Sequence, residues 1–124
     1  MRSPPPAPRP MHELALCRAL LREVETLATE RGARAVQTVT VRIGPLSGIE
    51  PALLRAAYPI ACAGSRAAGS ALEIESPPVR VRCLACEAET LAAPNRLACA
   101  ACGATRTQLL GGNELVLASV DLVY

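Results

Sequence analysis

Four cysteines of this chain occur as two pairs with the spacing of a metal site. The pairs are Cys83–Cys86 and Cys99–Cys102, with two residues inside each pair and 12 residues between the pairs. Such pairs can place four thiolates at the corners of one tetrahedron, the geometry that zinc favours. Four thiolates leave no open position for a substrate, so we expect a metal that builds structure rather than one that performs chemistry.

Other interpretations of the same cysteines are two disulfides, four unrelated core residues, or an iron site. The first residues have no apolar region of the kind that secretory signals contain, so we expect a cytoplasmic protein without disulfides. Iron would fit the same ligands, because the ligand set alone does not decide the metal, but zinc is the metal we expect. A redox pair normally follows a strand and opens a helix, which neither pair does.

The two remaining cysteines, Cys17 and Cys62, lie in apolar helical patterns without a partner at ligand spacing. We therefore expect both to be small buried hydrophobic residues.

His12 is the only histidine, and it directly follows Met11. A single histidine near an N-terminus is usually only a solvated side chain. If the mature chain began at Met11, however, the free amine, the next amides and the imidazole could chelate one ion in a plane. A planar set of nitrogen ligands selects Ni(II) or Cu(II) over zinc. Displaced amide protons would make the affinity fall as the pH drops.

The elements that would position these residues follow from hydrophobic periodicity. Residues 1–10 contain five prolines, which predicts a disordered extension. Apolar residues at helical spacing predict a helix from Leu14 to about Arg31, and alternation predicts a strand over 36–43. A second helix is expected from Pro51 towards Ala63–Gly64. Pro59 inside it should kink or shorten it, because proline removes a backbone donor.

Two further strands are predicted at Ala71–Glu75 and Glu114–Val123, where apolar and polar residues alternate. Val79–Arg82 should lead in extended form into the first cysteine pair, and the polar segment Glu87–Ala98 should be a surface loop. Gly103 follows the second pair, where a positive φ is often needed. The predicted fold is α+β: a three-stranded sheet with two helices, plus an inserted small lobe built on the four cysteines.

Composition excludes several classes of partner. The chain has 124 residues, a net charge of +2 and only two aromatic residues, Tyr58 and Tyr124. The arginines near the cysteine pairs are offset by glutamates, and there are no aromatic side chains there on which bases could stack, so nucleic acid is not expected as a partner. No apolar run is long enough to cross a bilayer, so no membrane partner is expected.

Four blocks, in order, resemble the HypA/HybF family of hydrogenase maturation proteins, which are nickel metallochaperones. They are Met11-His12-Glu13, the segment from Ile43 to Pro51, the two cysteine pairs, and the segment from Gly111 to Leu115. The resemblance extends from Met11 to the C-terminus. The first block is weak alone, but all four in order are highly specific.

The resemblance implies two lobes with separate sites for nickel and zinc. The nickel-binding α/β lobe would comprise residues 11–78 and 112–124, and the zinc-ribbon lobe residues 79–111. Nickel would be bound through His12, with Glu13 beside it and Glu50, in the loop before the second helix, as a further candidate ligand. Zinc would be held by the cysteines of the two pairs, Cys83, Cys86, Cys99 and Cys102.

The resemblance also implies partners and a role. Family members work with a nickel-insertion GTPase, HypB, and deliver the ion to the large subunit of [NiFe]-hydrogenase; some also serve urease. We therefore expect a nickel carrier that is not an enzyme, acting as a monomer or a homodimer. A zinc-ribbon module that binds nucleic acid or a protein complex is the alternative, and a small redox protein is a third hypothesis.

The beginning of the chain departs from the family pattern, because ten residues precede Met11. If Met1 is the true start, Met11 follows Pro10 in a peptide bond and has no free amine for nickel. A start at Met11 is the simpler account of the proline-rich lead.

Overall fold

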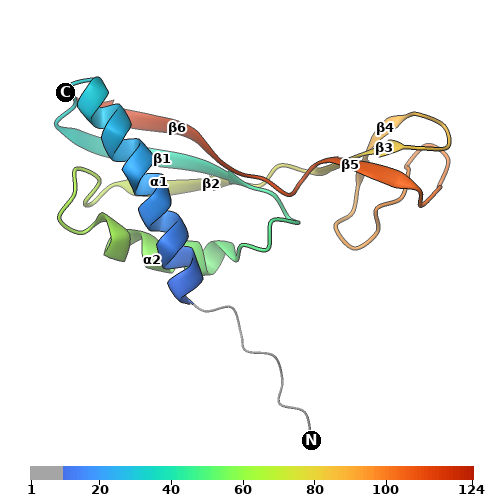
Figure 1. Ribbon diagram of the computed structural model, residues 1–124, viewed down its shortest axis with the longest axis horizontal. Coiled ribbons are helices and arrows are strands. Elements are labelled where there is room, and N and C mark those ends of the chain that lie inside the picture. The colour runs from blue at the N-terminus through green and yellow to red at the C-terminus, as the bar shows by residue number, and fades with distance from the viewer. Residues whose placement is uncertain (1–9) are drawn as a thin grey trace, which may run out of the picture. The chain divides into compact units, whose positions relative to one another are not determined.

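The computed structural model describes residues 10–124, which contain two helices and six strands (Figure 1). Residues 1–9 of the predicted disordered extension lie outside the described residues. The elements are α1 (Pro10–Glu30), β1 (Ala35–Ile43), α2 (Pro51–Cys62), β2 (Ala71–Glu75), β3 (Val79–Cys83), β4 (Glu89–Ala92), β5 (Thr107–Gly111) and β6 (Leu115–Val123). The strands form two three-stranded sheets, ordered β2-β1-β6 and β4-β3-β5.

The described chain divides into two compact units. Unit 1 comprises residues 10–40, 50–73 and 117–124, and unit 2 comprises residues 41–49 and 74–116. The segment 79–111, which was predicted to be the zinc-ribbon lobe, lies within unit 2. Two helices with one three-stranded sheet, and a separate lobe that carries the four cysteines, are the α+β fold expected from the sequence.

The core of unit 1 is formed by the two helices and β1. The buried face of α1 repeats at helical spacing, for example at Cys17, Val24 and Ala28, and Val39 of β1 is also fully buried. The helices pack against each other, and the Cys17 thiol donates to the carbonyl oxygen of Leu54 in α2 at 3.7 Å. This packing supplies the hydrophobic burial that neither helix could provide alone.

A proline bears on the predicted extent of each helix. The first begins at Pro10 rather than near Leu14, because proline is tolerated in the first turn, where its missing N–H would have no partner. The second helix, α2, runs from Pro51 to Cys62, close to its predicted end, so Pro59 does not shorten it, whereas the kink that was the other expectation for Pro59 stays a prediction. Residues on both sides of Pro59, including Leu54 and Cys62, are buried, and their packing offsets the lost hydrogen bond.

The sheet of unit 2 contains two strands that the sequence did not predict. The central strand β3 pairs in antiparallel fashion with β4, where Arg82 lies opposite Glu89, and with β5, where Cys83 lies opposite Thr107. Part of the expected surface loop Glu87–Ala98 is therefore strand β4. Both missed strands are short and have no fully buried residue, so their alternation was too weak to recognise.

A close backbone approach joins two of the segments that carried the family resemblance. The amide of Gly44 donates to the Glu114 carbonyl oxygen at 2.8 Å, and the amide of Leu46 donates to the Gly112 carbonyl oxygen at 2.6 Å. A Cβ atom on Gly44 would lie 2.2 Å from the Gly112 carbonyl oxygen, so no larger residue fits there without movement of the backbone.

Neither helix in the described part of the chain combines the length and the hydrophobicity of a membrane span.

Candidate metal centres

The four paired cysteines come together in unit 2 as the sequence predicts. Their Sγ atoms all lie within 4.8 Å of one another, and the Cys83–Cys102 and Cys86–Cys99 Sγ distances are both 3.6 Å. A tetrahedral ion with Zn–S bonds of about 2.3 Å would separate its sulfur ligands by about 3.8 Å. The bond of a disulfide is about 2.05 Å long, and all four cysteines are free thiols. The donor set therefore fits a tetrahedral, thiophilic ion such as zinc.

The two cysteine pairs form similar turns, the first at the end of β3 and the second between β4 and β5. In the first, the amides of Ala85 and Cys86 both donate to the Cys83 sulfur at 3.3 Å. In the second, the amide of Ala101 donates to the Cys99 sulfur at 3.3 Å. These hydrogen bonds to sulfur hold the first cysteine of each pair in position.

The residue after each pair adopts a positive φ. Gly103 has a φ of +78°, which confirms the prediction for this position, and Glu87, at the same place after the first pair, has a φ of +65°. The resulting turns let the Glu87 amide donate to the Cys83 carbonyl oxygen at 3.0 Å and the Gly103 amide to the Cys99 carbonyl oxygen at 2.8 Å. A non-glycine residue rarely adopts this conformation, so the first turn is strained where the second is not.

Backbone amides also prepare two of the thiols for a metal. The amide of Cys102 is the main cause that lowers the pKa of Cys99, to about 6, and the amide of Cys86 is the main cause that lowers the pKa of Cys83. Metals bind the thiolate rather than the thiol, so a lower pKa reduces the proton competition at neutral pH. Cys83 and Cys99 are the buried members of the site, whereas Cys86 and Cys102 are exposed.

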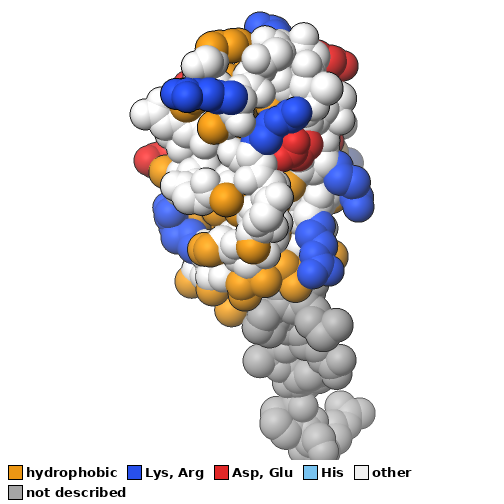
Figure 2. Space-filling model, turned by 90° about the vertical axis from the view of Figure 1, so that its left-hand side faces the viewer, with side chains coloured by type: hydrophobic (Ala, Val, Ile, Leu, Met, Phe, Trp, Pro, Cys, Tyr) orange, Lys and Arg blue, Asp and Glu red, His pale blue; other side chains and the backbone are white. Residues whose placement is uncertain are grey.

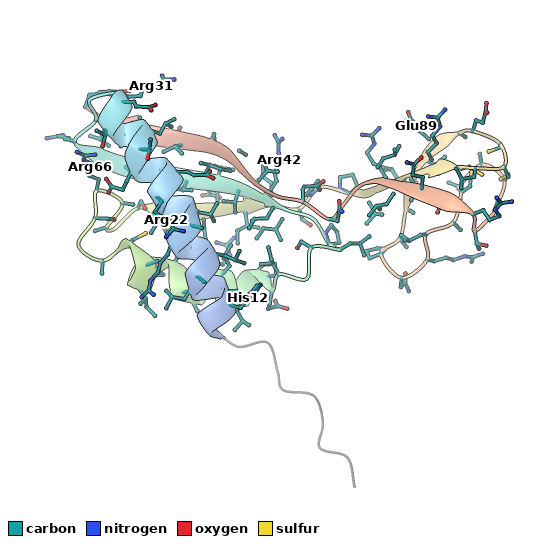
Figure 3. The ribbon with its side chains drawn as sticks, viewed as in Figure 1. His12, Arg22, Arg31, Arg42, Arg66 and Glu89 are labelled. Atoms are coloured by element: carbon teal, nitrogen blue, oxygen red, sulfur yellow. The ribbon has the colours of Figure 1, made fainter. Side chains whose placement is uncertain are left out.

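The three predicted nickel residues all lie in unit 1, but the structure does not bring them to one point. His12 is exposed in the first turn of α1 (Figure 3). Glu50 is exposed and caps α2, where its carboxylate accepts from the Ala52 amide at 3.5 Å. Within residues 10–124, only the four paired cysteines form a group of three or more ligand atoms close enough to share an ion. The assignment of nickel to these three residues stays a prediction.

Glu13 is the unusual member of this set. Its side chain is completely buried, and neither carboxylate oxygen has a hydrogen-bond partner among the residues that the structure describes. Burial of a carboxylate without a hydrogen-bond partner costs free energy, so Glu13 in this position lowers the stability of the fold. Because the His12 side chain is exposed and that of Glu13 is buried, one ion bound by both would require the first turn of α1 to rearrange.

The remaining two cysteines are core residues of unit 1, as expected. Cys17 has no exposed surface and Cys62 is 2% exposed. Burial, with smaller contributions from Cys62 and Glu13, raises the pKa of Cys17 to about 11, and burial also raises the pKa of Cys62. Both side chains therefore remain neutral thiols, which are poor ligands and poor nucleophiles.

The match to a family model decides which family the chain represents. The model described as "Hydrogenase/urease nickel incorporation, metallochaperone, hypA" matches residues 11–122. The chain belongs to the HypA family. The resemblance found in the sequence is thereby confirmed, and this family is one of metallochaperones and maturation factors rather than of enzymes.

Individual HypA proteins and structures agree with this assignment. The chain is 47% identical over 113 residues to the hydrogenase maturation factor HypA of Nitrosospira multiformis, covering 91% of this chain and 98% of that protein. It is 38% identical over 112 residues to the protein of the same name from Streptomyces avermitilis, covering 89% of this chain and 86% of that protein.

The fold is also found in solved HypA structures. A solution structure of a HypA protein superimposes with a TM-score of 0.69 at 25% identity, covering 91% of this chain and 97% of that one. The solution structure of the Ni metallochaperone HypA from Helicobacter pylori gives a TM-score of 0.65 at 24% identity, with coverages of 90% and 97%. The α+β fold of the chain is therefore the HypA fold.

Two features of unit 1 were missed by sequence reasoning. Glu13 was predicted as a possible nickel ligand beside His12, but its burial was not predicted; the only sequence signal for it is its place four residues before Cys17, on the buried face of α1. Arg18 and Arg22 were not marked as candidates, although their spacing of four residues places both charges on one side of the helix.

Proposed function

We propose that this HypA-family chain is a nickel metallochaperone that binds Ni(II) and delivers it during maturation of [NiFe]-hydrogenase, with urease as a further client. The family match over residues 11–122 carries the proposal. In this proposal the protein acts in the cytoplasm and is not an enzyme, because it binds nickel and releases it unchanged.

In this proposal, nickel binds in unit 1 at the exposed imidazole of His12. Glu50 is also exposed and can turn away from the Ala52 amide, because their hydrogen bond of 3.5 Å is long. Glu13 could join only if the first turn of α1 opens, which would also relieve the burial of its unpartnered carboxylate. A site that needs such a rearrangement binds weakly, as a carrier that must release its cargo requires.

The proposed role of the zinc ion is structural. Cys83, Cys86, Cys99 and Cys102 would bind it, and zinc would supply a tetrahedral cross-link between the two turns. The chain itself supplies amide hydrogen bonds to Cys83 and Cys99, which hold these sulfur atoms in place.

The proposed partners are a HypB-like nickel-insertion GTPase and the large subunit of [NiFe]-hydrogenase, and the chain would act as a monomer or a homodimer. The support for these partners is membership of the HypA family, which is described by its role in nickel incorporation.

The substitution His12→Ala tests the nickel site. We expect the variant to lose nickel in equilibrium dialysis at concentrations where the parent binds it, while its zinc content, measured by mass spectrometry of the elements, stays unchanged. Glu89→Gln, an exposed carboxylate in β4, is the matched control and should bind nickel as the parent does. In cells that lack their own copy, His12→Ala should not restore hydrogenase activity. Parent-like nickel binding together with restored activity would refute the proposal.

The role of the amine can be tested separately. The 124-residue chain and a version that begins at Met11 are compared in the same dialysis. We expect tighter nickel binding by the shorter version, because its free amine adds a nitrogen ligand. Equal affinities would show that the amine does not bind nickel, and the imidazole would then be left as the principal ligand.

A further inference from the structure

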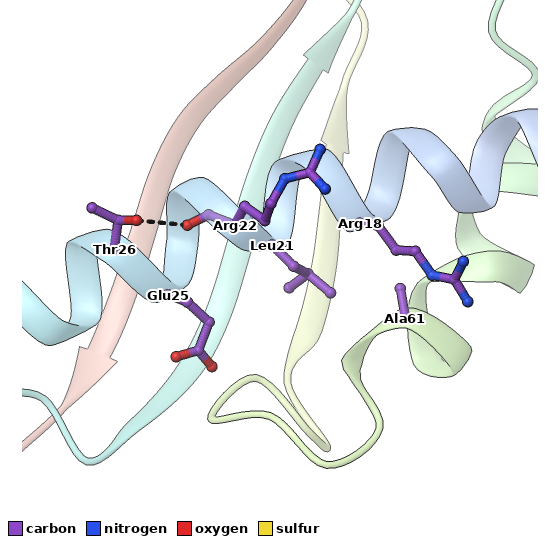
Figure 4. A pocket seen from close by; sticks show the side chains of 6 residues that line it. All are labelled: Arg18, Leu21, Arg22, Glu25, Thr26 and Ala61. Atoms are coloured by element: carbon purple, nitrogen blue, oxygen red, sulfur yellow. Dashed lines mark hydrogen bonds between the residues drawn. The ribbon is translucent and has the colours of Figure 1, made fainter.

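A groove between the two helices of unit 1 has no role in the proposed metal sites. It has a volume of about 540 Å³ and is lined by Arg18, Leu21, Arg22, Glu25 and Thr26 of α1 and by Ala61 of α2 (Figure 4). We call it the α1–α2 groove. Leu21, which is buried, and the small side chain of Ala61 contribute its apolar surface.

Two arginines give the groove an uncompensated positive charge. Arg18 and Arg22 are four residues apart on α1, so their charges lie on one side of the helix and repel each other. The neighbouring carboxylate of Glu25 is already taken: it accepts from the Arg66 amide at 2.8 Å and from its guanidinium at 3.2 Å. Within residues 10–124, no carboxylate lies at ion-pair distance from Arg18 or Arg22.

The helix on the other side of the groove exposes apolar rather than charged side chains. Ile60, next to Ala61, is 65% exposed, and the outward residues of α2 also include Ala56 and Pro59. The only charged residue of α2, Arg55, donates to the Leu72 carbonyl oxygen at 3.0 Å. Figure 2 shows hydrophobic side chains gathered at the lower end of this face, the level at which α2 lies in Figure 1.

We propose that the α1–α2 groove is a docking site for an acidic segment of a partner protein that also carries aliphatic side chains. Carboxylates of the segment would pair with the guanidinium groups of Arg18 and Arg22, and an aliphatic side chain would enter beside Ala61. An amphipathic helix that lies in a groove between two helices combines both contacts. Pairing with carboxylates would also remove the repulsion between the two arginines.

Other occupants fit these observations less well. Nucleic acid would meet the Glu25 carboxylate and would find no aromatic side chain in the groove lining. A second copy docked symmetrically would bring its own Arg18 and Arg22 against those of the first, which is repulsive. A small free anion would not use the apolar part of the groove.

The probe for this proposal is a fluorescein-labelled synthetic helix with leucines at helical spacing and glutamates on both flanks. Two matched peptides carry lysine or glutamine in place of glutamate. Binding to the full zinc-loaded chain is followed by fluorescence anisotropy at low and at high salt. We expect the glutamate peptide to bind at low salt, less tightly at high salt, and the other two peptides to bind weakly.

Charge reversal locates the site. The double variant Arg18→Glu/Arg22→Glu should bind the glutamate peptide about 10-fold or more weakly and should gain affinity for the lysine peptide. Arg31→Glu/Arg34→Glu is the matched control, because both arginines are exposed in unit 1 and neither lines the groove. Circular dichroism confirms that each variant keeps its helices.

Several outcomes would overturn the proposal. One is that the parent chain shows no binding of the glutamate peptide at low salt. Another is that the control Arg31→Glu/Arg34→Glu loses as much affinity for that peptide as Arg18→Glu/Arg22→Glu does. A third is that Arg18→Glu/Arg22→Glu gains no affinity for the lysine peptide. A concentration-dependent dimer in sedimentation that Arg18→Glu/Arg22→Glu dissociates would assign the groove to a second copy instead. His12→Ala should bind the peptide as the parent does, so a failure here is distinguishable from a failure of the nickel site.

Discussion

The two units of this chain are stabilised in different ways. In unit 1, the two helices and β1 together bury many aliphatic side chains, among them Val24, Val39 and Leu54, which have no exposed surface. In unit 2, Leu84 and Leu91 are 56% and 59% exposed, and the sheet and cysteine turns bury only two valines and two cysteines among their hydrophobic residues. Unit 1 therefore depends on hydrophobic packing, whereas unit 2 depends on what its four thiols bind.

This difference explains why the two proposed metals would behave differently. The thiols of unit 2 are already gathered and held by amide hydrogen bonds, so an ion bound there would be hard to remove. The candidate nickel residues of unit 1 are dispersed, and one of them is buried. A fold that does not depend on nickel can release it without unfolding.

Removal of the metal is the strongest test of the comparison. Zinc binding contributes about 10–16 kcal/mol in small four-ligand peptides, more than the exposed sheet of unit 2 can replace. We expect a strong chelator, or Cys99→Ser, to collapse the amide NMR signals of 79–111 while those of α1 keep their dispersion. Cys62→Ala, a buried cysteine of unit 1, is the control and should leave the metal content unchanged. Loss of the amide signals of both units, or of neither, would contradict the view that only unit 2 depends on the metal.

Truncation of a core leucine should have the next largest effect, and only in unit 1. Leu54→Ala removes a fully buried side chain and should lower the free energy of unfolding by about 2–5 kcal/mol, measured by urea titration of the helical circular dichroism signal. Leu91→Ala, in β4, should change it by less than about 0.5 kcal/mol, because that side chain is largely exposed. Equal effects of the two substitutions would mean that unit 2 has a hydrophobic core of its own.

The smallest expected effects compare the two cysteine turns. Gly103→Ala should weaken zinc binding by about 1 kcal/mol, roughly fivefold in competition with a coloured chelator, because alanine is strained at this positive φ. Glu87→Gly should strengthen it by up to about the same amount, since it removes that strain from the first turn. Both positions are surface turns; a Cβ at residue 103 would meet no atom within 4 Å, so backbone strain alone is tested.

Gly111→Ala is the control for this pair, because Gly111 has no positive φ and a Cβ there would make only an ordinary contact with the Glu114 carboxylate at 3.5 Å. Shifts of the same sign for Gly103→Ala and Glu87→Gly would show that the turn conformation does not limit zinc binding.

The features that the sequence determined by itself are those with a local signal. The spacing of Cys83–Cys102, the helical period of α1 and the alternation in β1 each follow from a few neighbouring residues, and all three are present in the structure. The positive φ of Gly103 is local in the same sense, because the geometry of a four-residue turn requires it.

Tertiary structure decided what depends on distant segments. The short strands β4 and β5 exist because β3 pairs with both, and Gly44 must be glycine because Gly112 lies against it. Packing of α1 against α2 also forms the groove beside Arg18, and only the structure shows that Glu13 is buried while its neighbour His12 is exposed. Burial and close approach are properties of two surfaces in contact, so no periodicity within one segment can report them.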